Sequence, residues 1–171
     1  MAIRKIGFGG GCHWCTEAVF ASLKGVLAVD QGWITELSHD FFSEAVTVTF
    51  DDSIIPLETL MEIHLYTHSS TANHSMRAKY RSAVYVFSEE DRGEAIAILD
   101  RLKKQFKDNI ITEILYFGAF KRNRAESLDY YYTDPGRPFC ENYINPKLQL
   151  LMRQFSGAVD FKKLGHLMKD E

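Results

Sequence analysis

The stretch that decides the fold runs from Ile3 to Leu23 and reads IRKIGFGGGCHWCTEAVFASL. Residues 3–9 read as a short strand that runs into three consecutive glycines, a residue that permits tight turns and a close approach of the backbone. A helix is expected next, from about His13 to Leu23, with apolar residues along one side. The chain therefore begins with a strand, a glycine turn and a helix that starts directly after Cys12.

The rest of the chain continues this alternation of strands and helices. Further strands are expected at 26–34, 44–50, 83–87 and 110–117, and helices from about 56 and over 89–106. This order predicts an α+β fold: a two-layer sandwich with a ferredoxin-like split βαβ arrangement, a mixed sheet and helices on one face. From about residue 118 the sequence becomes rich in aromatic residues, proline and glycine. We expect this part, 118–171, to form a C-terminal arm with short helices that wraps the domain.

The composition is that of a globular protein, and the length suggests one domain over residues 1–171. The net charge of −3 argues against a broad nucleic-acid-binding face, which needs an excess of basic residues. The first residues, MAIRKIGFGGG, lack the apolar run of a signal peptide, and no segment approaches the roughly 18 apolar residues of a membrane span. We therefore expect a cytoplasmic monomer without membrane or nucleic-acid partners.

Cys12 stands between the glycine run and the expected helix, at a position that activates a thiol. The unpaired N–H groups at a helix N-terminus favour negative charge. A thiolate there is stabilised, so the pKa of the cysteine falls below its free value. Because the thiolate is the reactive form of cysteine, Cys12 is the candidate nucleophile.

Cys15 follows Cys12 with CxxC spacing, and Cys140 is the third cysteine. Three cysteines do not make a secreted disulfide framework. The spacing alone leaves three interpretations open: a redox pair, half of a zinc site, or two packing residues. A zinc site would need Cys140 and a histidine as further ligands, and no second CxxC is present. Packing alone leaves the three glycines unexplained, so we favour the redox interpretation and expect no metal and no cofactor.

The run GGGCHWCTEAVF at 9–20 resembles the active-site signature of the A-type peptide methionine sulfoxide reductases, whose usual core is GCFWG. Further blocks are similar to family segments in the same order, over roughly residues 5–155: SEAV at 43–46, KYRSA at 79–83, AE at 125–126, PFC at 138–140 and NPKL at 145–148. The resemblance implies an α+β sandwich and reduction of the S epimer of methionine sulfoxide, free or in peptides.

The resemblance also implies a role for each matching residue. Cys12 attacks the sulfoxide sulfur, and Glu44 protonates the sulfoxide oxygen, which is a poor leaving group until it gains a proton. Tyr80 hydrogen-bonds the same oxygen, and Trp14 packs against the substrate methyl group. Cys12 then becomes a sulfenic acid. A glutamic acid that donates a proton near neutral pH needs burial to raise its pKa, and the apolar strand that follows Glu44 can supply it.

A second thiol is expected to condense with the sulfenic acid to form a disulfide, which thioredoxin or a similar reductant opens again. Position within the family favours Cys140 as this resolving cysteine. Proximity favours Cys15, since one turn at a helix start keeps two Cα atoms within the roughly 7 Å that a disulfide requires.

Two substitutions within the matching blocks alter the expected substrate pocket. His13 replaces the usual phenylalanine, which removes an apolar wall and adds a titratable group. We favour a solvent-facing or packing role for it over a role in stabilising the Cys12 thiolate. Ser75 replaces an aspartate, so a hydroxyl takes the place of a charge. Both remain candidate substrate-binding residues.

Other functions remain possible from the sequence. A general thiol–disulfide oxidoreductase would use Cys12 and Cys15 without Glu44. A zinc-binding structural domain would use the three cysteines as ligands. A module that binds or senses sulfoxides would lack catalytic turnover. Glu17 is expected to be an ordinary acid near the helix start. Tyr130, Tyr131 and Tyr132 are expected to pack the arm on the core.

Overall fold

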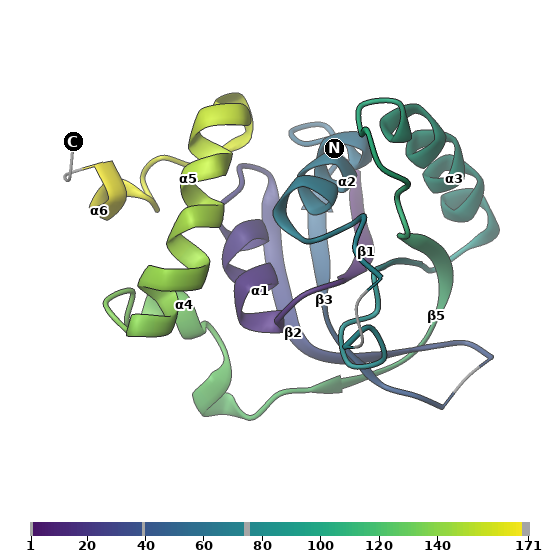
Figure 1. Cartoon of the computed structure of the whole chain (residues 1–171), viewed down its shortest axis with the longest axis horizontal. Helices are drawn as coiled ribbons and strands as arrows, with labels where there is room; N and C mark the ends of the chain where they lie inside the picture. The colour runs from purple at the N-terminus through teal and green to yellow at the C-terminus, as the bar shows by residue number, and fades with distance from the viewer. Residues whose placement is uncertain (1, 39, 74–75, 169–171) are drawn as a thin grey trace.

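The strand and the helix expected at the N-terminus are both present: β1 covers Ile3–Gly9 and α1 covers His13–Ala21. The structure is a computed structural model that describes residues 2–38, 40–73 and 76–168 (Figure 1). Its other elements are, in chain order, β2 (Val26–Glu36), β3 (Ser43–Asp51), α2 (Leu57–Thr67), β4 (Ala83–Val86), α3 (Glu89–Lys103), β5 (Glu113–Arg122), the 3-10 turn η1 (Ala125–Ser127), α4 (Tyr130–Thr133), the π-helix η2 (Cys140–Ile144), α5 (Asn145–Gln154), the 3-10 turn η3 (Ser156–Ala158) and α6 (Gly165–Met168). The expected α+β order is confirmed.

The five strands form a mixed sheet, as expected, but its two edges meet. The strand order is β1-β3-β2-β5-β4, with β4 and β5 parallel and the other neighbours antiparallel. β1 also pairs with β4, Gly7 opposite Tyr85, and this pairing closes the sheet into a small barrel. Residue 7 must be small here, since a Cβ on Gly7 would lie 2.9 Å from the Cβ of Tyr85. The sheet therefore curls further than the expected sandwich.

The closed sheet separates two hydrophobic cores. The larger core lies between the sheet and the helices and includes Val84 and Val86 of β4. The smaller core lies on the other face of the sheet and contains Ala83 and Tyr85. Alternate residues of a strand point to opposite faces, so β4 is buried on both sides. Strand β1, which leads to Cys12, is held in the wall between the two cores.

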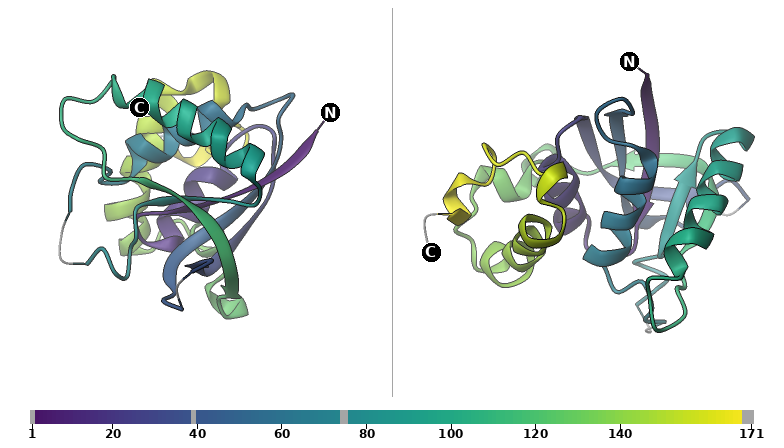
Figure 2. Two further views of the ribbon diagram at one scale, coloured as in Figure 1. Left: turned by 90° about the vertical axis from the view of Figure 1, so that its right-hand side faces the viewer. Right: turned by 90° about the horizontal axis from the view of Figure 1, so that it is seen from above.

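Helices α1, α2 and α3 lie on one side of the sheet, and the C-terminal arm packs on the far side of α1 (Figures 1 and 2). Helix α3 begins at Ser88, whose Oγ accepts a hydrogen bond of 3.1 Å from the N–H of Asp91. Helix α1 lies between β2 on one side and α4 and α5 on the other. The N-terminal end of α1 is therefore enclosed by the sheet, the loop before β4 and the arm.

Strand β5 extends beyond the expected arm boundary at residue 118 and ends at Arg122. Gly118 is part of the strand because it lets β5 pass close to β2: a Cβ there would lie 2.7 Å from Thr35 Oγ1. The glycine thus marks a close backbone contact and not the end of the strand, and the arm begins after residue 122. Within the described part of the chain, no helix combines the length and apolarity required to cross a membrane.

Candidate active site

Cys12 occupies the N-cap of α1, with its backbone at φ −56° and ψ 132°. Its thiol is half-buried, and it lines a cavity of about 460 Å³. The carbonyl of Cys12 accepts a hydrogen bond of 3.1 Å from the N–H of Thr16, which closes the first turn of the helix. The sequence prediction of a cysteine at a helix start is confirmed, and the sulfur faces open space.

A hydrogen bond with the Cys15 thiol lowers the pKa of Cys12 more than any other contact. The N–H groups of Cys15 and Trp14 lower it further, whereas burial and the nearby Glu44 carboxyl raise it. The same bond to Cys12, followed by burial, raises the pKa of Cys15. Cys12 is therefore the more acidic thiol of the pair, and Cys15 is the less acidic one. The helix start contributes less to this activation than the neighbouring thiol does.

The cavity beside Cys12 is formed by three parts of the chain that are distant in sequence. These are the glycine turn, the segments around residues 68–80 and the arm, which contribute Gly10, Gly11, Cys12, Cys15, His68, Ser69, Met76, Tyr80, Phe139, Tyr143 and Lys147. Burial lowers the pKa of His68 to about 3, so this histidine is neutral. The expected oxygen-binding residue, Tyr80, thus lies in the same cavity as the nucleophile.

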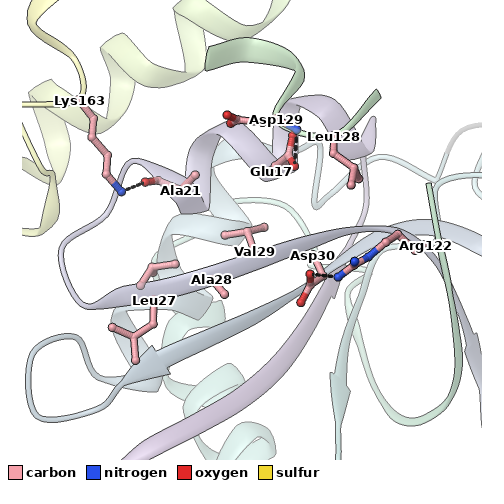
Figure 3. Close-up of a pocket in the computed structure, with 11 residues that line it drawn as sticks. Glu17, Ala21, Leu27, Ala28, Val29, Asp30, Arg122, Leu128, Asp129 and Lys163 are labelled. Carbon is pink, nitrogen blue, oxygen red and sulfur yellow. Dashed lines mark hydrogen bonds and ion pairs between the residues drawn. The ribbon is translucent and has the colours of Figure 1, made fainter. Parts of the chain in front are cut away.

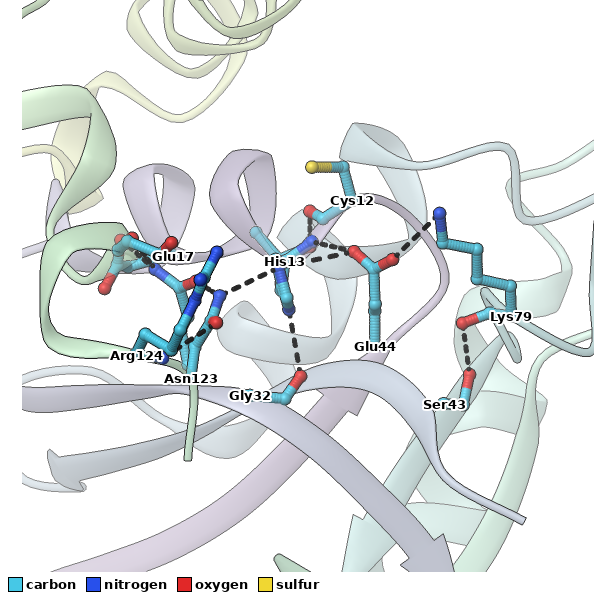
Figure 4. Close-up of polar contacts among 12 residues, drawn as sticks. Cys12, His13, Glu17, Gly32, Ser43, Glu44, Lys79, Asn123 and Arg124 are labelled. Carbon is cyan, nitrogen blue, oxygen red and sulfur yellow. Dashed lines mark hydrogen bonds and ion pairs between the residues drawn. The ribbon is translucent and has the colours of Figure 1, made fainter. Parts of the chain in front are cut away.

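Glu44 lies near the start of β3 and is buried, with 6% of its surface exposed. Its Oε1 accepts a hydrogen bond of 3.3 Å from the backbone N–H of His13, next to Cys12 (Figure 4). Its Oε2 lies 3.5 Å from Nζ of Lys79, an exposed side chain. Glu44 is not part of the lining of the cavity, but its hydrogen bond to the His13 N–H places the carboxyl beside the residue that follows Cys12. The burial expected from sequence is present.

His13 is buried, which agrees with the packing alternative and not with the solvent-facing one, and its ring is not part of the cavity lining. Nδ1 lies 3.0 Å from the carbonyl oxygen of Gly32, and Nε2 lies 3.5 Å from Oε1 of Glu44. The start of α1 turns this side chain toward the sheet, away from Cys12. His13 therefore contacts the expected acid and not the expected substrate pocket or the thiolate.

Trp14 packs against the arm, and it too is absent from the cavity lining. Its ring stacks on Tyr130 with 4.1 Å between centroids and meets the edge of Phe139 at 5.6 Å. Among the residues that the structure describes, Nε1 of Trp14 has no hydrogen-bond partner. The aromatic residues that line the cavity beside Cys12 are Phe139, Tyr143 and Tyr80 instead. The remaining expected substrate-binding residue, Ser75, lies outside the described residues.

The two candidate resolving cysteines have different surroundings. Cys15 lines the cavity and is hydrogen-bonded to Cys12. Cys140 is fully buried at the start of η2, where its Sγ lies 3.6 Å from the carbonyl oxygen of Asp134, and burial raises its pKa. None of the three cysteines forms a disulfide. Cys15 is therefore the thiol in place for an immediate reaction with Cys12.

Lys147 is a cavity residue that sequence reasoning did not assign to the site. Burial lowers its pKa, and its Nζ donates a hydrogen bond to the carbonyl of Thr67. Its charge in turn lowers the pKa of Cys15. The NPKL block, which resembles a family segment, could have drawn attention to this lysine. Nothing in the sequence indicated that α5 would bring it to the cysteines.

A second cavity, of about 330 Å³, lies on the other side of α1, away from the cysteines (Figure 3). Glu17 lines it, and this residue is buried instead of being an ordinary acid near the helix start. Its carboxyl accepts hydrogen bonds from Gln31 and from the backbone N–H groups of Asp129 and Tyr130. The reason for its burial is the arm, which folds over it and uses it as an anchor. Tyr131 is buried beside this anchor, and the expected packing of the arm is confirmed.

The zinc hypothesis finds little support in the described part of the chain. No group of three histidine, cysteine, aspartate or glutamate residues there could hold a metal ion. His64 and His68 have HxxxH spacing, but their Nε2 atoms contact the Gly9 carbonyl oxygen at 2.7 Å and Ser82 Oγ at 2.7 Å. Both rings therefore serve the packing beneath the glycine turn.

Comparisons with known proteins show which family the chain resembles. The family model for peptide methionine sulfoxide reductase matches residues 4–158. The chain is 31% identical to the peptide methionine sulfoxide reductase MsrA of Psychrobacter cryohalolentis, an alignment that covers 90% of this chain and 97% of the relative. Mxr1 from Saccharomyces cerevisiae in reduced form has a similar fold, with a TM-score of 0.73 at 19% identity over 82% of this chain and 91% of that chain.

A second solved structure shares the fold as well. Mxr1 from Saccharomyces cerevisiae in complex with Trx2 matches with a TM-score of 0.58 at 20% identity, over 75% of this chain and 84% of that chain. The region matched by the family model extends from β1 through the arm to η3, and it includes Cys12, Glu44, Tyr80 and all three cysteines. The chain belongs to the peptide methionine sulfoxide reductase family.

Proposed function

We propose that this chain reduces methionine sulfoxide, as the S epimer, free or in proteins, with Cys12 as the nucleophile. One observation carries the proposal: Cys12 and Cys15 share a cavity with Tyr80, and the buried Glu44 accepts a hydrogen bond from the backbone N–H of His13, the residue after Cys12. A soft nucleophile, a proton donor and a hydrogen-bond donor for oxygen are the groups that sulfoxide reduction requires.

In the first step the Cys12 thiolate attacks the sulfoxide sulfur. Glu44 gives its proton to the sulfoxide oxygen, the bond between that oxygen and the substrate sulfur breaks, and the oxygen passes to Cys12 as a sulfenic acid. Methionine leaves, and Glu44 remains as a carboxylate. Tyr80 donates a hydrogen bond to the oxygen as charge develops on it. The aromatic wall of Phe139 and Tyr143 receives the substrate methyl group in place of Trp14.

In the second step the Cys15 thiol condenses with the sulfenic acid, which forms a Cys12–Cys15 disulfide and releases water. Cys15 acts before Cys140 because it already contacts the Cys12 sulfur, whereas Cys140 is buried and bonded to Asp134. Lys147 assists by favouring the thiolate of Cys15. Cys140 then exchanges with this disulfide once the arm moves.

A thioredoxin-like dithiol completes the cycle: it is oxidised to its own disulfide and returns two chain cysteines to thiols. The support for this partner is the solved complex of the similarly folded Mxr1 with Trx2. We propose further that residues 1–171 form one reductase domain, that the chain acts as a monomer in the cytoplasm, and that it uses no cofactor.

The proposal is tested by mixing the reduced protein with peptides that carry either epimer of methionine sulfoxide, with dithiothreitol as reductant. Reduction of the S epimer is expected, and Cys12→Ser should abolish it. Turnover of the R epimer alone, or unchanged activity in Cys12→Ser, would contradict the proposal. Insulin should serve as a control substrate, because a general thiol–disulfide oxidoreductase would reduce its disulfides.

The order of the resolving thiols is tested by single turnover followed by mass spectrometry. Cys140→Ser should accumulate a Cys12–Cys15 disulfide, whereas Cys15→Ser should accumulate the Cys12 sulfenic acid, trapped by dimedone. If Cys15→Ser forms a Cys12–Cys140 disulfide as fast as the unmodified chain forms its first disulfide, Cys140 resolves first.

A further inference from the structure

A line of buried and partly buried polar side chains runs beneath α1 and joins Glu17 to Glu44, the acid of the proposed reaction (Figure 4). Glu17 accepts a hydrogen bond of 2.8 Å from Gln31 Nε2, and Gln31 Oε1 accepts one of 2.7 Å from Asn123 Nδ2. Asn123 Nδ2 also lies 3.2 Å from His13 Nε2, which in turn lies 3.5 Å from Glu44 Oε1. His13 is thus the last residue before the acid.

Backbone groups determine which way both amides in this line point. Gln31 Nε2 lies 2.8 Å from the carbonyl oxygen of Ser127, which can only accept a hydrogen bond. Asn123 Oδ1 lies 2.9 Å from the backbone N–H of Arg124, which can only donate one. The amide orientation follows from these fixed partners. Asn123 therefore presents an N–H group to His13.

This N–H group determines the state of the His13 ring. A nitrogen that faces a donor must accept, so Nε2 carries no hydrogen, and the ring hydrogen is on Nδ1. That assignment agrees with the other side of the ring, where Nδ1 lies 3.0 Å from the Gly32 carbonyl oxygen and donates to it. Both ring nitrogens then have suitable partners in a buried site.

Nε2 of His13 without a hydrogen and a deprotonated Oε1 of Glu44 would be two hydrogen-bond acceptors 3.5 Å apart. Both residues are buried, His13 with 5% and Glu44 with 6% of its surface exposed, so water does not separate the two atoms. A hydrogen on the carboxyl removes this conflict. We infer that the one lone pair of His13 Nε2 is shared between the Asn123 N–H at 3.2 Å and the hydrogen of the Glu44 carboxyl at 3.5 Å, and that this shared contact holds Glu44 in its acid form until the sulfoxide oxygen takes that hydrogen. His13 is a positioning residue, and this role rests on the proposed function of Glu44.

Some charged and titratable groups around His13 and Glu44 favour the carboxylate form of Glu44, and others favour its acid form. Lys79 favours the carboxylate of Glu44, but it is exposed and lies at 3.5 Å, so solvent screens its effect. The Cys12 thiolate on the other side disfavours a second negative charge at Glu44. Glu17 faces His13 through two neutral amides, and Lys121 of β5 lies over the ring of Trp33, which separates it from His13. His13 thus favours the protonated form of Glu44, and Lys79 favours the carboxylate.

The direct test is the pH profile of the sulfoxide step in single turnover. The rate should fall at high pH as Glu44 loses its proton. In His13→Phe this fall should move to lower pH by about half to one unit, because the carboxyl loses its acceptor. His13→Gln, whose amide oxygen can accept the same hydrogen, should restore most of the shift. Lys79→Gln should move the fall to higher pH, and the low-pH limb that reports Cys12 should stay in place in all variants.

A second measurement does not depend on activity. Nitrogen-15 spectra of labelled histidine, assigned by difference with His13→Phe, should show His13 neutral with the hydrogen on Nδ1 at neutral pH. An imidazolium, or a hydrogen on Nε2, would overturn the inference, as would a His13→Phe profile that is unchanged or shifted to higher pH. If the unmodified chain reduces no sulfoxide, the proposed function fails, whereas the nitrogen spectra still decide the state of His13.

Discussion

Glu17 and Glu44 are both buried with 6% of their surface exposed, yet their surroundings differ. Glu17 accepts hydrogen bonds of 2.8, 3.0 and 3.2 Å from Gln31 and from the N–H groups of Asp129 and Tyr130. Glu44 has longer contacts, of 3.3 Å to the His13 N–H and 3.5 Å to Lys79 and to the His13 ring. One carboxyl is tightly bound at the base of the arm, and the other is loosely held beside the nucleophile.

The comparison shows that a buried glutamate can serve either to hold the fold together or to transfer a proton. Short bonds to backbone N–H groups stabilise a carboxylate and tie two chain segments together. A carboxyl with long contacts and an acceptor for its hydrogen keeps a proton that it can transfer. We therefore expect changes at Glu44 to affect rate and changes at Glu17 to affect stability.

The largest expected effect is on rate, from Glu44→Gln. The amide cannot donate a proton to the sulfoxide oxygen, so the single-turnover rate should fall by about 10²–10⁴-fold. Thermal unfolding should remain close to that of the unmodified chain, because the lost contacts are long. A single-turnover rate within a factor of two or so of the original would refute the role of Glu44 as the acid.

Glu17→Ala tests the other carboxyl. It leaves the N–H groups of Asp129 and Tyr130 without their acceptor, and the free energy of unfolding should fall by about 1–3 kcal/mol. Urea denaturation measures this loss. The single-turnover rate in the folded protein should change far less than in Glu44→Gln. A rate loss of equal size would contradict the assignment of Glu17 to stability and Glu44 to catalysis.

Asn123→Ala breaks the link between the two carboxyls and should have a smaller effect. The loss of one partly buried amide should lower the free energy of unfolding by about 0.5–1.5 kcal/mol. Without the Asn123 donor, His13 Nε2 becomes free to take a proton, so the high-pH fall of the sulfoxide step should shift to lower pH. A stopped-flow pH series checks this, and an unchanged profile would show that Asn123 does not control the ring.

The smallest expected effect is a pH dependence of stability caused by Glu17. Burial raises the pKa of this carboxyl in the folded protein, against the opposing hydrogen bonds. An acid with a raised pKa binds its proton more tightly when folded, so its contribution is fully present below about pH 4.3 and is lost as pH rises through the folded pKa. Relative to Glu17→Gln, the chain should lose stability over that window. Denaturation curves in parallel buffers measure the difference, and the opposite slope would contradict it.

The N-terminal part of the site was predictable from local sequence. A strand, a glycine run, Cys12 and a helix are consecutive, so their order places the cysteine at the helix start without any distant contact. Glu44 was predictable by resemblance because it sits in a short block before an apolar strand. Cys15 was predictable as a partner from its spacing, since one helical turn brings the two thiols together.

The surroundings of other residues depend on distant segments. His13 was expected in solvent or in packing, and strands β2 and β3 bury it and place its ring beside Glu44, a contact that was not predicted. Glu17 was expected to be an ordinary acid, and the arm more than a hundred residues later buries it. Trp14 was expected to pack against the substrate methyl group, and in the structure its ring stacks on Tyr130 of the same arm.

The sequence by itself determined the α+β order, the activated Cys12 and its CxxC partner, because each depends on hydrophobic periodicity or on neighbours within one helical turn. The tertiary structure alone decided that β1 meets β4 to close the sheet, that Lys147 of α5 reaches the cysteines, and that His13 contacts Glu44. These contacts join segments that are far apart in the chain. Their partners are chosen by packing around a shared core, which no local pattern specifies.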